Sequence, residues 1–171
     1  SDPSRGLGDV YKRQAVDISD YPKILSYSPT FYDENNNEIN FINALIQNGV
    51  NTIRLRLWVN PADESSSLEE VKEFSNELRS MGFKIWITPH FSDTWAHPGQ
   101  QQIPSNWESL SFEELKNQLY AHTNQIMSEI NPDYIQIGNE INTGILFPHG
   151  NIMDNQNQFI ELVNVGVDAV R

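Results

Sequence analysis

The stretch NTIRLRLWV, residues 51–59, has the strict alternation of apolar and polar side chains that is typical of a β-strand. Its two faces differ: Ile53, Leu55 and Leu57 lie on one, and Arg54, Arg56 and Trp58 lie on the other. Three more strands are expected at AVDIS (15–19), FKIWITPH (83–90) and YIQIGNE (134–140). The chain is therefore expected to contain a sheet of at least these strands.

Helical patterns separate the strands. A helix is expected over residues 38–48, and a last helix from about Asn155 to the C-terminus. Two further helices open at sequences with the spacing of a capping box, Ser67 with Glu70 and Ser111 with Glu114. The segment 91–110 holds two prolines and two tryptophans, which favours a long but ordered loop.

Alternation of strands and helices implies right-handed βαβ units and a parallel sheet, either doubly wound or closed into a barrel. The G-x-G-x-x-G and P-loop sequences of nucleotide-binding sheets do not occur. Polar side chains instead cluster where strands end: Asp17, Arg54, Arg56, His90, Asn139 and Glu140. Barrel enzymes build their sites there, and a whole barrel takes about 250 residues. We expect an α/β fold of the (β/α)8 TIM-barrel type, of which this chain covers about the first four β/α units.

Residues 15–171 are expected to be the N-terminal half of a catalytic barrel, and residues 1–14 (SDPSRGLGDVYKRQ) read as a leader foreign to it.

The composition of the chain excludes some classes of partner and site. The net charge of −12 disfavours nucleic acid and anionic membranes as partners. The absence of cysteine excludes disulfides and thiolate metal sites. No apolar run reaches membrane-spanning length, and no signal-peptide core is visible.

Asn139 and Glu140 end the last expected strand. A carboxyl group at a strand end beside apolar walls can have a raised pKa and donate a proton to a leaving oxygen. An amide beside it can hold a substrate hydroxyl. The alternative is a strand-terminal turn, in which an Asn-Glu pair has no catalytic meaning.

Arg54 and Arg56 project from the same side of a strand that should be buried on both faces. Two buried guanidinium groups need carboxylate partners, so such partners are expected nearby. The pairs could hold the barrel together, could serve the reaction by keeping a carboxylate ionised, or could do both.

His90, Asp93 and His97 could be a metal set, but the loop setting lacks the helical spacing that places two histidines on one face. A strand-end His90 that donates to a sugar hydroxyl is favoured, and no metal site is expected. Trp58, Trp95 and Trp107 could stack on sugars or fill the core. Trp95 is the best candidate for stacking because it follows His90 in the loop.

Several segments together resemble glycoside hydrolase family 53, the arabinogalactan endo-β-1,4-galactanases: AVDIS, GVNTIRLRLWVNP, HFSDTWAHPGQQQIPSNW and YIQIGNEINTGILFPHG. The resemblance runs from about Ala15 to Arg171. It implies that Glu140 is the acid/base, and that the substrate-binding residues are Asn139, Arg54, Arg56, His90, Asp93, Trp95 and Asp17. The sequence departs from the family where Phe91, His97 and Phe147 stand in place of Tyr, Asp and Trp.

The resemblance implies retaining endo-hydrolysis of β-1,4-galactan or arabinogalactan by a secreted, periplasmic or cell-surface enzyme. Its nucleophile is a second Glu on the seventh strand, so this chain by itself is expected to be inactive. No cofactor is expected in this half, and a calcium ion is implied only for the other. The alternatives are another clan-related endo-β-glycanase, such as a mannanase or cellulase, a non-catalytic glycan-binding barrel and, more remotely, a metal-dependent hydrolase.

Overall fold

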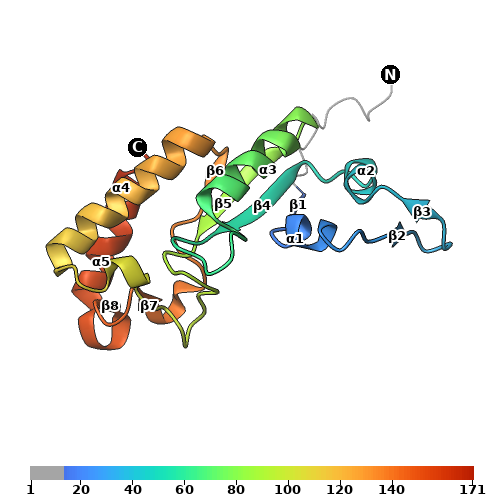
Figure 1. Cartoon of the computed structure of the whole chain (residues 1–171). Coiled ribbons are helices and arrows are strands. Elements are labelled where there is room, and N and C mark those ends of the chain that lie inside the picture. Colours follow the sequence, from blue (N-terminus) through green and yellow to red (C-terminus); the bar gives the residue numbers. More distant parts are fainter. Residues whose placement is uncertain (1–13) are drawn as a thin grey trace, which may run out of the picture.

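The computed structural model describes residues 14–171. Its central sheet consists of β1 (Ala15–Asp17), β4 (Thr52–Leu57), β5 (Lys84–Pro89) and β6 (Tyr134–Ile135), in that spatial order (Figure 1). Every neighbouring pair in this sheet is parallel. The predicted order and direction of the strands are confirmed.

The register of the sheet brings the strand ends together. Asp17 of β1 lies opposite Arg54 of β4, and Arg54 lies opposite Trp86 of β5. Because all four strands run the same way, the residues that follow them meet at one edge. The carbonyl of Gln14, which belongs to the segment set aside above, accepts hydrogen bonds from the amides of Asn51 and Thr52.

Two long helices, α3 (Leu68–Ser80) and α4 (Phe112–Ile130), pack on one side of the sheet, and a third, α5 (Ile152–Asp168), packs on α4 and on the hairpin that precedes it (Figure 1). Ser67 and Ser111 cap α3 and α4 as predicted, and Glu114 completes a capping box. The box predicted at Ser67 is incomplete, because the Glu70 carboxylate accepts from the amide of Ser66 instead. The apolar face of β4 is fully buried against α3 in one core cluster. A second cluster joins α4, α5 and the loop that contains Phe91 and Trp107. The helices thus fix the positions of the loops at the edge.

Two boundaries differ from expectation before β4. The strand β1 ends at Asp17 because the Asp17 carboxylate accepts a hydrogen bond from the amide of Ser19 and turns the chain. After the short helix α1 (Tyr21–Leu25), the strands β2 (Phe31–Tyr32) and β3 (Glu38–Ile39) form a hairpin. The expected helix at 38–48 is wrong in its first residues: α2 (Phe41–Gln47) begins after the cap Asn40.

The last expected strand is also shorter than 134–140. The amide of Gln136 still bonds to the carbonyl of Ile87, but Gly138 has a φ of 78° and turns the backbone out of the sheet. Four short elements lie outside the expected strands and helices: η2 (Ser105–Trp107), η3 (Ile141–Thr143), β7 (Gly144–Ile145) and β8 (Gly150–Asn151). The helix α5 begins at Ile152 and has non-helical angles at Asn155, where the last helix was expected to start.

Gly138 is expected to be intolerant of a side chain. An added Cβ would lie 2.6 Å from the Cγ2 of Ile141, in a left-handed conformation that itself costs an L-residue about 1–2 kcal/mol. Gly82 is a matched control, because its φ is 93° and nothing lies within 4 Å of an added Cβ. Urea unfolding should therefore show a larger loss for Gly138→Ala than for Gly82→Ala. Equal losses would contradict a steric role for Ile141.

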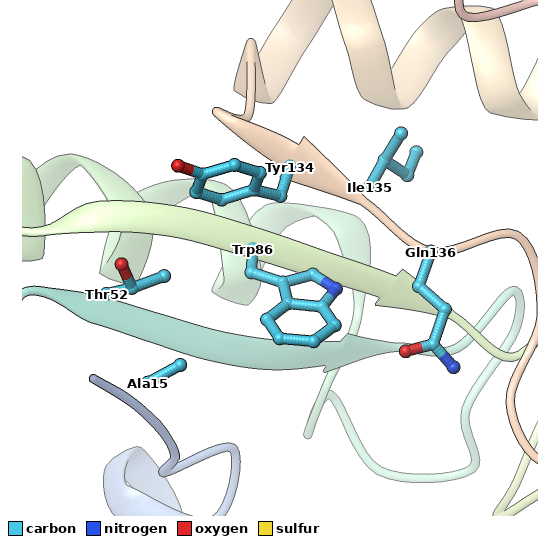
Figure 2. Close-up of a pocket in the computed structure, with 6 residues that line it drawn as sticks. All are labelled: Ala15, Thr52, Trp86, Tyr134, Ile135 and Gln136. Atoms are coloured by element: carbon cyan, nitrogen blue, oxygen red, sulfur yellow. The ribbon is translucent and has the colours of Figure 1, made fainter. Parts of the chain in front are cut away.

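The face of the sheet opposite the helices is hollowed near the beginnings of the strands. A pocket of about 460 Å³ lies there, lined by Ala15, Thr52, Trp86, Tyr134, Ile135 and Gln136 (Figure 2). The side chains that fill a barrel interior normally occupy this position. The pocket extends from the first residues of three strands to Trp86, which lies opposite Arg54, and to Gln136 just beyond β6. No helix among residues 14–171 is long and apolar enough to cross a membrane.

Candidate active site

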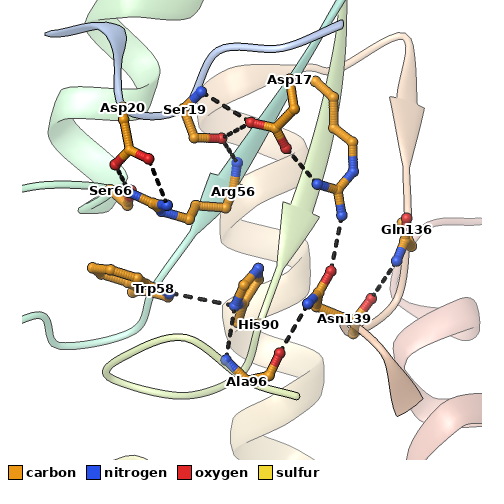
Figure 3. A network of polar contacts seen from close by, with 12 residues as sticks. Asp17, Ser19, Asp20, Arg56, Trp58, Ser66, His90, Ala96, Gln136 and Asn139 are labelled. Atoms are coloured by element: carbon orange, nitrogen blue, oxygen red, sulfur yellow. Dashed lines mark hydrogen bonds and ion pairs between the residues drawn. The ribbon is translucent and has the colours of Figure 1, made fainter. Parts of the chain in front are cut away.

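An ion pair and a hydrogen bond link three strands at the edge where they end (Figure 3). The guanidinium of Arg54 pairs with the carboxylate of Asp17 and donates from Nη2 to Oδ1 of Asn139 at 2.9 Å. Asp17 also accepts hydrogen bonds from the amide and the hydroxyl of Ser19. Burial alone would raise the pKa of Asp17, but the bonds from Ser19 and Arg54 outweigh it and lower that pKa. Asp17 is therefore held as a carboxylate.

Arg56 is the second guanidinium of β4 and is buried. It pairs with the carboxylate of Asp20, and its Nε donates to the hydroxyl of Ser66 at 2.9 Å. Its guanidinium carbon lies 4.5 Å from the centre of the Trp58 ring. The prediction that both arginines have carboxylate partners is confirmed. Arg56 ties β4 to the segments on either side of it, and its contact with substrate stays a prediction.

Asn139 is almost fully buried and is held from three sides. Its Oδ1 accepts from Arg54, its Nδ2 donates to the carbonyl of Ala96 at 2.8 Å, and its backbone carbonyl accepts from Nε2 of Gln101 at 2.8 Å. One N–H of the amide remains for a ligand. Gln101 was missed from the sequence, because a glutamine in a polar loop gives no sign of being buried.

Glu140 follows Asn139 in a left-handed conformation, with φ of 47°. Its backbone carbonyl accepts from Gln101 at 3.3 Å. Its side chain is exposed rather than enclosed by apolar side chains, and none of residues 14–171 donates a hydrogen bond to its carboxylate. The carboxyl is therefore free to reach a ligand at the strand ends.

His90 lies at the centre of the cluster with 1% of its surface exposed. Its Nδ1 accepts hydrogen bonds from the indole N–H of Trp58 at 3.3 Å and the amide of Ala96 at 3.1 Å (Figure 3). Burial is the main cause that lowers its pKa to about 4, and the charges of Arg54 and Arg56 add to it. The imidazole is thus neutral at the pH of ordinary assays.

The stability of the protein is expected to fall as the pH drops from about 6.5 to about 4. His90 and His122 both have a pKa near 4 when folded, against an ordinary value of 6.5. In that window the unfolded chain takes up protons that the folded chain does not, so unfolding becomes easier as the pH falls. A shift of this size corresponds to about 3 kcal/mol per histidine.

The carboxylates also titrate in this range, but they contribute equally to wild type and His122→Phe. The difference in the free energy of unfolding between the two proteins therefore reports His122 alone. Phe should fit the site, because the ring of His122 lies edge-on between Phe91 and Trp107. Guanidinium unfolding at pH 7, 6 and 5 should show a weaker pH dependence for the variant. Parallel curves would contradict the shifted pKa of His122.

Asp93, Trp95 and His97 lie in the loop after β5. The Asp93 carboxylate accepts hydrogen bonds from the amide of Asn60 and from the amide and hydroxyl of Ser105, so it pins this loop. Its contact with substrate stays a prediction. Trp95 is 42% exposed and meets the ring of His90 edge-on at 5.2 Å. Residues 14–171 hold no group of three His, Cys, Asp or Glu side chains placed to bind a metal.

Comparisons with known proteins identify the family of this chain. The sequence pattern of glycosyl hydrolase family 53 matches residues 13–171. The arabinogalactan endo-β-1,4-galactanase A of Emericella nidulans is 36% identical over 132 residues, which are 74% of this chain and 37% of that protein. The arabinogalactan endo-β-1,4-galactanase of Thermothelomyces thermophilus is 37% identical over 71% of this chain and 38% of its own length.

Solved structures give the same result. The Ignisphaera aggregans GH53 catalytic domain matches with a TM-score of 0.85 and 37% identity, over 99% of this chain and 50% of that one. A fungal β-1,4-galactanase matches with a TM-score of 0.84 and 31% identity, over 92% and 48%. This likeness confirms the predicted barrel fold, and the chain spans about half the length of these structures. By its sequence and by its fold, the chain belongs to glycosyl hydrolase family 53.

Proposed function

We propose that a protein containing this chain cleaves β-1,4-galactan within the polysaccharide and retains the anomeric configuration. The observation that carries the proposal is the placing of an exposed Glu140 beside Asn139, which Arg54 holds at the ends of the parallel strands. The relatives that share this sequence are named arabinogalactan endo-β-1,4-galactanases. The net charge of −12 fits a neutral polysaccharide better than an anionic one.

Glu140 is the acid/base of the proposed reaction. Its carboxyl group donates a proton to the glycosidic oxygen while a second carboxylate attacks the anomeric carbon and forms a glycosyl-enzyme. Glu140 then takes a proton from the water that displaces the second carboxylate. The two carboxyl groups of a retaining enzyme are about 5–5.5 Å apart. The reaction uses no cofactor.

The second carboxylate has to come from outside the described cluster. Asp17 and Asp20 are each paired with an arginine, and Asp93 accepts three hydrogen bonds in its own loop. Relatives and solved structures are about twice as long as this chain, and their remaining half is the proposed source of the nucleophile. The chain by itself should release no reducing sugar.

The substrate contacts are proposed for the groups left free at the edge. Asn139 keeps one amide N–H for the 2-hydroxyl of the sugar, and the exposed ring of Trp95 offers a surface for stacking. Arg54 orients Asn139 through a hydrogen bond, and Asp17 holds Arg54 through an ion pair. We therefore assign these two residues to positioning Asn139 before any contact of their own with the sugar. Because a polysaccharide of this size does not cross a membrane, we propose an extracellular or cell-surface site of action.

A panel of polysaccharides tests the proposal. The gene product with the length of its relatives should release reducing ends from β-1,4-galactan, and much less from mannan or carboxymethyl-cellulose. NMR during the first minutes should show the β-anomer of the new reducing end. Faster cleavage of mannan or cellulose would favour the other clan-related glycanases. Tight binding of galactan without any cleavage would favour a non-catalytic barrel, and an initial α-anomer would exclude retention.

A further inference from the structure

Trp58 is partly buried and lies against the His90 ring on the side of Nδ1. Its indole N–H donates to Nδ1 of His90 at 3.3 Å, and the two rings meet edge-on with centres 6.4 Å apart (Figure 3). One face of the indole is covered by the guanidinium of Arg56 at 4.5 Å. That face of Trp58 is not free to stack on a sugar. The same guanidinium lies 5.6 Å from the centre of the Trp95 ring, so what distinguishes Trp58 is its hydrogen bond to His90.

The hydrogen bonds to His90 decide where its proton lies. A neutral imidazole has one N–H and one acceptor nitrogen. Nδ1 accepts from two donors, the indole of Trp58 and the amide of Ala96, neither of which can accept a hydrogen bond in return. These two donors favour an unprotonated Nδ1 with the hydrogen on Nε2, against the opposing influence of the Thr94 backbone, which also interacts with the ring and raises its pKa.

The Nε2–H group of His90 has no hydrogen-bond acceptor within the described part of the chain. Nε2 is buried and has no hydrogen-bond partner among residues 14–171. Buried polar groups are nearly always hydrogen-bonded, and an unsatisfied one in a native protein calls for an explanation. Burial, and after it the positive charges of Arg54 and Arg56, lowers the pKa of His90 and disfavours a second proton, so the ring stays a neutral donor.

The Ala96 peptide extends the same arrangement to Asn139. Its amide donates to His90, and its carbonyl accepts from Nδ2 of Asn139 at 2.8 Å (Figure 3). A single peptide unit thus orients both the imidazole and the amide next to Glu140. Trp58 is the side-chain member of this arrangement, and it can be replaced without altering the backbone.

We propose that Trp58 is a positioning residue, which fixes His90 as an Nε2–H donor toward a hydroxyl oxygen of the bound polysaccharide. The hydrogen bond from His90 to substrate rests on the proposed function, whereas the tautomer of His90 does not depend on it. Trp58 acts only through His90 and touches no reacting atom in this account.

The first test is the ¹⁵N NMR signature of the His90 imidazole, assigned by its loss in a His90→Gln variant. In the wild type, Nδ1 should have the shift of an unprotonated acceptor and Nε2 that of a protonated nitrogen. Trp58→Phe keeps an aromatic ring but removes the donor, so the Nδ1 signal should move. Trp95→Phe is the matched control, because Trp95 also lies edge-on to His90 but has no hydrogen bond to its Nδ1.

A wild-type ring protonated on Nδ1, or an Nδ1 signal that is the same in Trp58→Phe and wild type, would overturn the proposal. The second test is kinetic, on galactan with the protein at the length of its relatives. Trp58→Phe should lower kcat/KM about 3- to 10-fold, the factor one hydrogen bond is worth. A shifted tautomer with unchanged kcat/KM would refute the role toward substrate. Inactivity of the wild type on galactan would refute the proposed function and leave the NMR result standing.

Discussion

Glu140→Gln is expected to lower the rate of galactan hydrolysis by about 10²–10⁴-fold, the usual contribution of a general acid/base. Gln has nearly the shape of Glu but can neither donate the proton to the leaving oxygen nor take one from water. The exposed side chain makes few contacts that the change could disturb. The measurement is kcat on galactan for the protein at the length of its relatives.

Glu108→Gln is the matched control. It makes the same chemical change at an exposed residue that follows η2 and whose carboxylate has no hydrogen-bond or ion-pair partner among residues 14–171. This variant should keep the wild-type rate and unfolding temperature. If Glu140→Gln retained activity within a few-fold of wild type, the assignment of Glu140 would be wrong.

Asn139→Ala is expected to lower kcat/KM on galactan by about 10²-fold or more. The variant loses the donor to the sugar 2-hydroxyl, and hydrogen bonds at that position strengthen in the transition state of glycoside hydrolysis. It also leaves an N–H of Arg54 and the carbonyl of Ala96 without partners at a nearly buried site. Unpaired buried groups cost about 1–3 kcal/mol, so stability should fall as well.

Measuring kcat/KM and the unfolding temperature separately distinguishes these two effects. The control is Asn142→Ala, which makes the same substitution at an exposed position in η3 and should change neither kcat/KM nor the unfolding temperature. For Asn139→Ala, assays well below the unfolding temperature should still show the loss of kcat/KM. A variant that unfolds more easily but cleaves galactan at the wild-type rate would show that Asn139 only supports the structure.

The sheet could be predicted from local patterns, because strands and helices of this kind are encoded by side-chain periodicity. The alternation around Arg54 placed β4, and the capping serines placed the starts of α3 and α4. The shortening of the last strand had a sign in the sequence, since a glycine inside a strand pattern often marks a bend. That sign was Gly138, whose positive φ sends Asn139 and Glu140 out of the sheet.

The partners within the site were harder to predict. Buried guanidinium groups require carboxylates, and family resemblance pointed to Asp17 as a site residue. The pairing of Arg56 with Asp20 and Ser66 joins segments from both sides of β4, and periodicity carries no information about such contacts. The orientation of Asn139 depends on the backbone of Ala96, whose position is set by how the whole loop after β5 folds. Every residue carries the same backbone carbonyl, so the sequence does not show which carbonyl will accept a hydrogen bond from Asn139.

Chemical rescue of Glu140→Gly tests the central claim most directly. Glycine tolerates the left-handed angle at this position, so the backbone should keep its course. With a dinitrophenyl β-galactobioside, whose leaving group needs no proton, the glycosyl-enzyme should form but hydrolyse slowly. Azide needs no general base, so it should speed turnover and displace the enzyme carboxylate from the anomeric carbon. Two inversions then give a β-galactobiosyl azide, which is the predicted product. An α-azide would identify Glu140 as the nucleophile instead, and a rate that azide does not change would contradict its role as the acid/base.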